Sequence, residues 1–422
     1  MPAAERVVVV GGGIAGLVAA RALALAGRDA VVLEKNDRLG GQVAAHSVAG
    51  IELDAGADAY AVRGGEVARL LRALHLDDDI VTPAATPAWL HRADGTAVPL
   101  PATSLLGIPG VPLARDVIDA IGMRAALRAQ LDNLMPGLVA SKASTVGELV
   151  RRRMGRGVLE GLVAPVVRGV HSTTPDELDL DATSPGLRTA LLRLGSLAAA
   201  VRSQREGAPA GSPVASLRGG LHRMVSALAA DLDRFGVPVR TGVEVVAADP
   251  HGVVTTDGER IAGEVLLAAP IGLDAAPSRV TVVTIAVDAP ELGAPRGTGV
   301  LVAPNAPGVA ARALTHLTAK WEWLAAATPL QLLRLSYDDE VDVGPELARR
   351  DAEALLGRSL PAPADVAVVR WQRFGRRPSA EHAIDGMLRV GEAESGTGLA
   401  SVVPYALQIA NAIPSGGAGA PD

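Results

Sequence analysis

The feature that most constrains this chain is a glycine turn between a short strand and a helix near its start. Residues 5–10 (ERVVVV) are rich in β-branched side chains, and GGGIAG follows them directly. An alanine- and leucine-rich stretch then runs to Gly27, and RDAVVLE after it is typical of a second strand. Because crossovers between such strands are right-handed, the two strands are expected to lie parallel, in the first unit of a doubly wound sheet.

The turn satisfies the G-x-G-x-x-G pattern through Gly11, Gly13 and Gly16. Without Cβ atoms, this backbone can approach a pyrophosphate, and the helix that begins with Ile14 and Ala15 points its positive end at the charge. Gly16 allows the helix to pack closely on the strand. The context of strand, turn and helix therefore predicts a dinucleotide site.

An acidic residue supports this prediction, because Glu34 ends the second strand at about the expected 20 residues from the first glycine. There it can accept hydrogen bonds from a ribose diol. Lys35, Arg38, Gly40 and Gly41 follow, and the glycine pair can line the same pyrophosphate or a ribityl chain. This second glycine pair favours FAD over NAD as the dinucleotide. No second G-x-G-x-x-G is present, so a flavin reductase with a separate nicotinamide domain is not supported, and we expect an oxidase or dehydrogenase.

Composition excludes several other classes. The length of 422 residues predicts two or three lobes able to enclose a ligand. Hydrophobic residues make up 49% of the chain, as is typical of a globular protein. A net charge of -6 argues against nucleic-acid binding. The absence of cysteine excludes disulfides, thiolate metal sites and a cysteinyl bond to flavin, and we expect no metal site.

Residues 7–27 are mostly apolar, but three consecutive glycines and Arg21 interrupt them. A membrane span keeps about 20 residues apolar, and a secretory signal needs a basic start and a cleavage site. We therefore expect no transmembrane or secretory segment and a cytoplasmic enzyme.

Beyond the first unit, periodicity predicts helices at 66–76, over most of 114–170, at 186–204 and around 345–356. Proline and glycine mark 85–112 as short extended pieces, and a tight turn is expected at Asp257-Gly258. Residues 206–213 are expected to be an exposed turn, and the last nine residues a disordered tail.

The segment from GGGIAGLVAARALALAG to VVLEKNDRLGG resembles the start of the large family that contains monoamine oxidases, carotenoid desaturases and protoporphyrinogen oxidases. Five later segments resemble the oxygen-dependent protoporphyrinogen oxidases, especially the soluble Gram-positive forms that act on coproporphyrinogen III. These segments are 55–76, 98–110, 146–180, 217–232 and 315–325. Gln42 departs from the family, which usually has a basic residue after the glycine pair.

The resemblance implies an α/β fold (α+β with a Rossmann-like core). It comprises a discontinuous, doubly wound FAD-binding domain, a mixed-sheet substrate domain and a helical insertion that lines the substrate cavity. The FAD-binding parts are expected at 1–84, 211–275 and 377–413, the substrate parts at 85–112 and 276–376, the insertion at 113–210, and the tail at 414–422.

The resemblance also implies roles for single residues. Arg63 would pair with a propionate beside the porphyrinogen cavity, Gly169 would let backbone approach the macrocycle, and His171 would contact the substrate. Val245 would lie at the adenine. Further cofactor contacts are implied for Gly391, Gly398 and Leu399 at the isoalloxazine. No side chain is assigned as a catalytic base, because the chemistry is centred on the flavin.

The implied reaction is the FAD-dependent oxidation of coproporphyrinogen III or protoporphyrinogen IX in haem biosynthesis. Six electrons would pass in three steps to dioxygen and give hydrogen peroxide. Partners would be the porphyrinogen, dioxygen and a further haem-pathway enzyme, with no nucleic acid and no stable membrane insertion. Three alternatives stay open: a soluble FAD-dependent amine oxidase, a carotenoid desaturase, and a non-catalytic flavin-binding partner protein.

Overall fold

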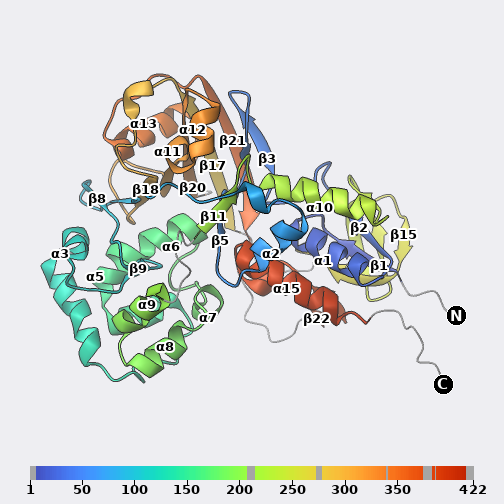
Figure 1. The fold of residues 1–422 in the computed structure, drawn as a ribbon, viewed down its shortest axis with the longest axis horizontal. Coiled ribbons are helices and arrows are strands. Elements are labelled where there is room, and N and C mark those ends of the chain that lie inside the picture. Colours follow the sequence, from blue (N-terminus) through green and yellow to red (C-terminus); the bar gives the residue numbers. More distant parts are fainter. Residues whose placement is uncertain are drawn as a thin grey trace.

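The fold of the chain is known from a computed structural model, which describes residues 6–206, 214–271, 278–338, 341–373, 383–384 and 386–414. Figure 1 shows three lobes: a doubly wound domain, a second sheet with its own helices, and a helical lobe below that sheet. Of the expected turn at 206–213 and the expected tail at 414–422, residues 207–213 and 415–422 lie outside the described residues.

The first unit is the predicted one: strand β1 (Val7–Val10), helix α1 (Ile14–Leu25) and strand β2 (Ala30–Leu33). β1 pairs in parallel with β2 and with β16 (Glu264–Leu267). Both faces of β1 are buried, as expected for a parallel strand covered on two sides. The complete sheet has the order β12-β2-β1-β16-β23-β22, with β12 at Val239–Arg240, β23 at Met387–Arg389 and β22 at Ala383–Ile384.

The sheet draws its strands from three distant stretches of the chain, and each face has its own cover. Val7 and Val9 pack in the core with the helices, and Val8 and Val10 pack in a smaller core on the other face. The helices are α1, α2 (Glu66–Ala73), α10 (His222–Arg234) and α15 (Leu399–Ala412). The other cover is an antiparallel sheet of β13 (Val245–Asp249), β14 (Gly252–Thr255) and β15 (Arg260–Ala262).

A mixed sheet of seven strands forms the second lobe, and every neighbour pair in it is antiparallel except β18 with β7. Its order is β21 (Asp365–Arg373), β17 (Ser278–Val287), β20 (Gln331–Asp338), β19 (Ala313–His316), β18 (Gly299–Val302), β7 (Trp89–His91) and β8 (Ala97–Pro99). Helix α13 (Pro345–Leu356), close to its predicted place, packs on one face. Helices α11 (Leu317–Lys320) and α12 (Glu322–Ala327) pack on the other.

Two small sheets lie where the first two lobes meet. Strands β3 (Ala45–Val48) and β4 (Ile51–Asp54) form a hairpin. Strand β11 (Val214–Leu217) pairs with β5 (Tyr60–Ala61) and with β6 (Ile80–Val81).

The expected tight turn at Asp257-Gly258 joins β14 to β15, with Gly258 in the left-handed region at φ 84°. This conformation favours glycine.

The third lobe is helical, as predicted for most of 114–170. Its helices are α3 (Arg115–Gln130), α4 (Val146–Arg153), α5 (Arg156–Val158), a π-helix (Leu159–Val163), α6 (Ala164–His171), α7 (Leu180–Thr183), α8 (Leu187–Leu194) and α9 (Leu197–Glu206). A two-stranded ribbon, β9 (Ser104–Leu105) with β10 (Ile108–Pro109), packs beside α9.

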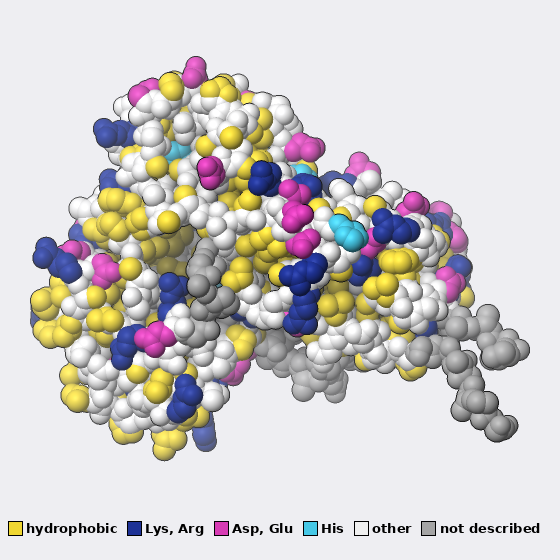
Figure 2. Space-filling model, viewed as in Figure 1, with side chains coloured by type: hydrophobic (Ala, Val, Ile, Leu, Met, Phe, Trp, Pro, Cys, Tyr) yellow, Lys and Arg dark blue, Asp and Glu magenta, His cyan; other side chains and the backbone are white. Residues whose placement is uncertain are grey.

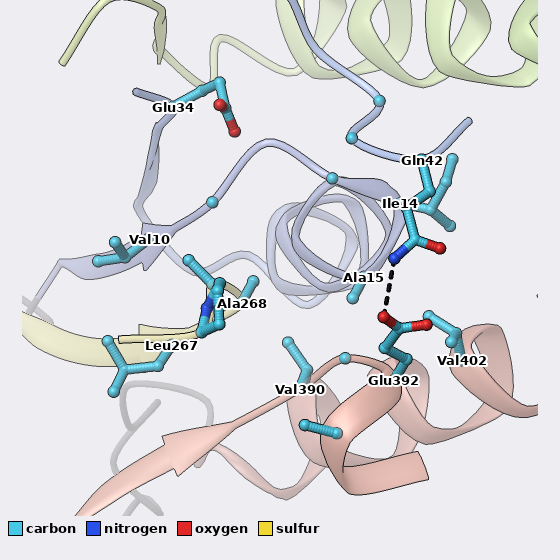
Figure 3. A pocket seen from close by; sticks show the side chains of 18 of the residues that line it. Val10, Ile14, Ala15, Glu34, Gln42, Leu267, Ala268, Val390, Glu392 and Val402 are labelled. Atoms are coloured by element: carbon cyan, nitrogen blue, oxygen red, sulfur yellow. Dashed lines mark hydrogen bonds between the residues drawn. The ribbon is translucent and has the colours of Figure 1, made fainter. Parts of the chain in front are cut away.

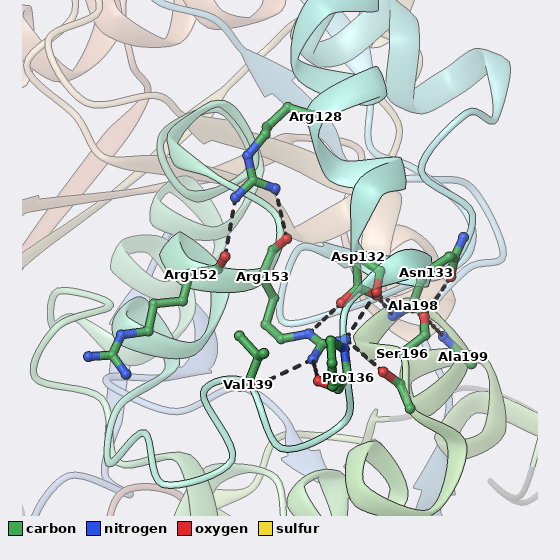
Figure 4. A network of polar contacts seen from close by, with 11 residues as sticks. Arg128, Asp132, Asn133, Pro136, Val139, Arg152, Arg153, Ser196, Ala198 and Ala199 are labelled. Carbon is green, nitrogen blue, oxygen red and sulfur yellow. Dashed lines mark hydrogen bonds and ion pairs between the residues drawn. The ribbon is translucent and has the colours of Figure 1, made fainter.

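The prediction of one helix over 186–204 is wrong. Gly195, at φ 77°, ends α8 in the left-handed conformation, and the hydroxyl of Ser196 then accepts from the backbone N–H of Ala199. A left-handed glycine followed by a serine cap is a common way to end one helix and start another. Arg153 holds the carbonyl of Gly195 at this junction with a 2.7 Å hydrogen bond (Figure 4).

Candidate functional site

A cavity of about 460 Å³ opens where the carboxyl ends of the parallel strands meet the N-terminus of α1 (Figure 3). This is the place where open α/β sheets bind ligands, and the volume is in the range of about 300–1,000 Å³ typical of cofactor sites. Its walls combine the glycine turn, the end of β2, the loop after β16 and the start of α15. Segments from both ends of the chain therefore form one site.

The glycines of the turn serve different purposes. A Cβ at Gly11 would lie 2.8 Å from the carbonyl oxygen of Ala268, and one at Gly16 only 1.9 Å from that of Gly11. Both glycines are needed for close packing of backbone. A Cβ at Gly13 would meet no protein atom within 4 Å, and Gly13 lines the cavity. The open space at Gly13 is thus available to a ligand at the helix N-terminus.

Glu34 is buried at the end of β2, with its carboxylate at the cavity wall. One carboxylate oxygen accepts from the backbone N–H of Gly12 at 2.7 Å. The other accepts from the backbone N–H of Asn36 at 2.9 Å and from its side-chain amide at 2.6 Å. These hydrogen bonds fix the direction of the carboxylate, as a group that receives a ligand's hydroxyls requires.

The second glycine pair lies directly against the first turn. Gly40 donates its backbone N–H to the carbonyl of Gly12 at 2.8 Å and forms an isolated bridge with Gly13. Gly41 lines the cavity, as does Lys35. Arg38 does not line it: the side chain is exposed and its nearest acceptor, at 3.4 Å, is the carbonyl of Gly41.

The opposite wall comes from the last part of the chain. Gly391, Gly398 and Leu399 line the cavity there, and a Cβ on either glycine would meet no protein atom within 4 Å. Val245, at the start of β13, lines it on the side of Glu34. Of the residues predicted to contact the cofactor, the cavity therefore brings together all except Gly16 and Arg38. Their individual roles stay predictions.

Several residues of the wall were not predicted from the sequence, and two groups of them are described next. The loop from Ala268 to Ile271 follows β16, and its position at the carboxyl end of a central strand was the available signal. Glu392 is another wall residue that was not predicted, although it directly follows the predicted Gly391. The amide of Gln42 donates to its carboxylate at 2.7 Å across the cavity (Figure 3) and to the carbonyl of Gln372 at 3.1 Å.

The cavity fits the ADP half and the flexible chain of FAD by three observations on its own residues. The N-terminus of α1 faces it, so that backbone N–H groups and the helix dipole favour a pyrophosphate there. A fixed carboxylate, Glu34, is placed to accept from ribose hydroxyls. Gly13, Gly391 and Gly398 leave space that any side chain would fill.

The three predicted substrate residues do not line this cavity. Arg63 is exposed and donates to the hydroxyl of Ser401 at 2.9 Å, beside the cavity residue Val402. His171 ends α6, and its Nδ1 lies 3.5 Å from the hydroxyl of Thr397. Thr397 precedes Gly398, so Arg63 and His171 both lie next to the wall formed by the last segment.

Gly169 has a structural explanation of its own. A Cβ there would lie 2.4 Å from Cδ2 of Leu301, so the glycine allows α6 to pack on β18. This packing is one reason for a glycine at the position, and the predicted approach to a macrocycle stays a prediction. In the described residues, no group of three or more histidine, aspartate or glutamate side chains is arranged to hold a metal ion. No helix of the described part combines the length and hydropathy needed to cross a bilayer.

Comparison with known proteins gives a consistent picture. Residues 14–296 match the family model described as flavin containing amine oxidoreductase. A coproporphyrinogen III oxidase of Propionibacterium freudenreichii subsp. freudenreichii is 28% identical over 297 residues, which cover 62% of this chain and 56% of that protein. In this match the chain spans only about half the length of its relative.

Two further likenesses extend over more of the chain. A coproporphyrinogen III oxidase of Mycobacterium bovis is 31% identical over 399 residues, 86% of this chain and 85% of that protein. The crystal structure of a putative protoporphyrinogen oxidase from Exiguobacterium sp. superposes with a TM-score of 0.80 at 25% identity, and covers 97% of this chain and 99% of that one. The predicted fold class is confirmed by this superposition.

Proposed function

The chain belongs to the family of flavin containing amine oxidoreductases, as the sequence resemblance predicted, and from this premise we propose that it oxidises a porphyrinogen with FAD as cofactor. The observation that carries the proposal is the likeness to a coproporphyrinogen III oxidase over 86% of this chain. Coproporphyrinogen III is the first candidate substrate, and protoporphyrinogen IX the second, because they differ only in substituents on the same ring.

The residues of the cavity have distinct tasks in this proposal. Bound FAD would supply the two-electron acceptor for each step of the oxidation. The backbone N–H groups at the start of α1 bind the pyrophosphate, and Glu34 accepts from the ribose hydroxyls. Val245 contacts the adenine, while Gly391 and Gly398 make room for the ring system. The protein contributes binding, orientation and exclusion of water rather than a dedicated base.

The substrate lies beyond the last segment of the chain in this proposal. Arg63, held at the hydroxyl of Ser401, pairs with a propionate, for which a guanidinium is suited by its planar set of donors. His171, next to Thr397, contacts the substrate on the other side.

Dioxygen is the acceptor that completes each cycle. The cytoplasm is the proposed location, and a further haem-pathway enzyme the proposed partner.

The proposal is tested by an anaerobic spectrum of the purified flavoprotein with each porphyrinogen. Coproporphyrinogen III is expected to bleach the flavin absorbance, and admission of air is expected to restore it with formation of hydrogen peroxide and porphyrin fluorescence. Faster bleaching by protoporphyrinogen IX would make it the first candidate substrate and coproporphyrinogen III the second.

Two outcomes would replace the proposal. Bleaching by a polyamine, with no response to either porphyrinogen, would identify an amine oxidase. A stably bound yellow chromophore that no porphyrinogen reduces would favour a flavin-binding partner protein without turnover. Controls with free FAD exclude direct reaction of the porphyrinogen with the cofactor in solution.

A further inference from the structure

Two arginines from different lobes share one carboxylate beside α6. Arg168, on α6 in the helical lobe, donates to Oδ2 of Asp338 at 2.8 Å. Arg312, which directly precedes β19 in the second lobe, donates to Oδ1 of the same residue at 3.0 Å. Among the described residues, two guanidinium groups therefore face one carboxylate.

The guanidinium of Arg312 is held where water has little access. The side chain of Arg312 is only 5% exposed, while that of Asp338 is 49% exposed. Arg312 also donates to the hydroxyl of Ser172 at 2.7 Å, but its Nε–H is buried without an acceptor among the described residues. A buried cation that is not fully paired is costly. Within the described part of the chain, Arg312 therefore lacks a full set of acceptors.

One route connects the cluster with the cofactor cavity along the chain. Ser172, the residue held by Arg312, has a left-handed backbone at φ 53° and follows His171. His171 lies against the hydroxyl of Thr397, and the next residue, Gly398, lines the cavity. The cluster is thus a few side chains away from the wall at which we place the ring system of the cofactor.

A second route crosses the seven-stranded sheet. Asp338 on β20 is opposite Val280 on β17, which is opposite Trp371 on β21. The neighbouring Gln372 accepts a hydrogen bond from Gln42 of the cavity wall. Since adjacent strands lie about 4.8 Å apart, the strand of Asp338 is about 10 Å from the strand that contacts this wall.

We propose that Arg168 and Arg312 form a subsite for a carboxylate of the substrate, with Asp338 as the internal counter-ion that the carboxylate displaces. This inference rests on the proposed function, because it assigns the subsite to an anionic substrate oxidised at the cavity. Figure 2 shows that the surface is hollowed beside α6, between the sheet lobe and the helical lobe. A subsite with two guanidinium donors favours a ligand with carboxylates and disfavours a cationic amine.

The sharpest test uses two substitutions with opposite expected signs. Arg168→Gln removes one donor, so the KM for coproporphyrinogen III is expected to rise roughly tenfold or more, with kcat within about twofold. Asp338→Asn removes the competing anion, so KM is expected to fall. Both side chains are partly exposed, at 32% and 49%, so both variants are expected to fold. Arg151→Gln, which breaks the exposed pair with Asp176, is the matched control and should leave KM unchanged.

A structural ion pair would give a different result. In that case Arg168→Gln and Asp338→Asn would lower the melting temperature together and shift KM in the same direction, and the subsite would be refuted. An unchanged KM in Arg168→Gln would refute it as well. Binding of the oxidised product, coproporphyrin III, followed by the shift of its main absorption band, provides a readout that does not depend on turnover.

A small anion separates failure of the subsite from failure of the proposed function. Millimolar propionate is expected to raise the melting temperature of Asp338→Asn, but not of the double variant Arg168→Gln/Asp338→Asn. If the protein ignores porphyrinogens and propionate still stabilises Asp338→Asn, the anion subsite stands and the substrate must be another carboxylate. If porphyrinogens are oxidised but neither KM nor propionate binding responds, the subsite is refuted and the function stands.

Discussion

Glu34 shows how one side chain can be prepared for a ligand before the ligand arrives. Both carboxylate oxygens are held by hydrogen bonds from Gly12 and Asn36. A carboxylate whose direction is fixed in this way loses little freedom when it accepts two hydroxyl groups. The neutral amide of glutamine would keep the shape but lose charge-assisted hydrogen bonds.

We therefore expect Glu34→Gln to raise the Kd for FAD by roughly tenfold to a hundredfold, the usual range for lost hydrogen bonds to a charged group. The measurement is a titration of the apoprotein with FAD, followed by quenching of flavin fluorescence. Asp37→Asn, an exposed acid in the next loop, is the control for lost charge. Equal affinities in both variants would contradict the role of Glu34.

His46 is a residue whose protonation is coupled to folding. Burial and, to a lesser degree, the charge of Arg334 lower its pKa to about 4, against the opposing effect of Asp54. Both ring nitrogens are buried without a partner among the described residues. The unfolded chain takes up a proton near pH 6.5, whereas the folded protein resists protonation until about pH 4.

The stability contributed by neutral His46 is thus complete above pH 6.5 and is lost as the pH falls toward 4. We expect His46→Gln to remove up to roughly 3 kcal/mol of the decrease in unfolding free energy across this window. Urea unfolding at several pH values measures the decrease. His251→Gln, at an exposed histidine, should retain the wild-type slope, and an unchanged slope in His46→Gln would refute the prediction.

At the scale of elements, the helical lobe is held together by Arg153 and Asp132 (Figure 4). Both side chains are fully buried and pair at 2.5 Å. Arg153 also donates to the carbonyls of Pro136 and Gly195, and Asp132 accepts from the backbone of Ala198 at the start of α9. The pair thus connects α4, the turn after α3 and the junction of α8 with α9.

We expect Arg153→Met to lower the free energy of unfolding of the lobe by about 3–5 kcal/mol, because it leaves the Asp132 carboxylate buried without a cation. Arg152→Met, in the next position, breaks a pair with Glu148 in which the arginine is 60% exposed, and should cost less than about 1 kcal/mol. Denaturant unfolding followed by circular dichroism compares the two. Equal losses of unfolding free energy in the two variants would show that the buried pair stabilises the lobe no more than the exposed pair does.

At the scale of the whole molecule, the cofactor domain is assembled from both ends of the chain. Helix α15 packs its buried side chains against α1 in one core, and β23 pairs with β16 in the same sheet as β1. Buried Leu399, Val402, Val403 and Ile409 contribute about 1.5–3 kcal/mol each. Their sum is comparable to the total stability of a typical domain, about 5–15 kcal/mol.

A chain ending at residue 376 is therefore expected to lose both FAD binding and cooperative unfolding, while a chain ending at residue 414 keeps them. The ratio of flavin to protein absorbance after purification and the melting curve with added FAD measure the two properties. Retention of FAD by the shorter chain would mean that the first segments form the site without α15.

The amino-acid sequence by itself determined the parts of this protein that depend on local order. The glycine turn, α1 and Glu34 are separated by few residues, so strand, turn and acid are tied together by chain connectivity and could be predicted. The break at Gly195 is local as well, and the glycine followed by serine was its signal.

Only the tertiary structure decided which distant residues share the site. The meeting of Gln42 with Glu392, and of Arg168 and Arg312 with Asp338, requires segments that are distant in the sequence to pack in one arrangement. Such contacts are fixed by burial of apolar faces, a non-directional force proportional to area. It leaves no periodicity or spacing in the sequence that would identify the partners it brings together.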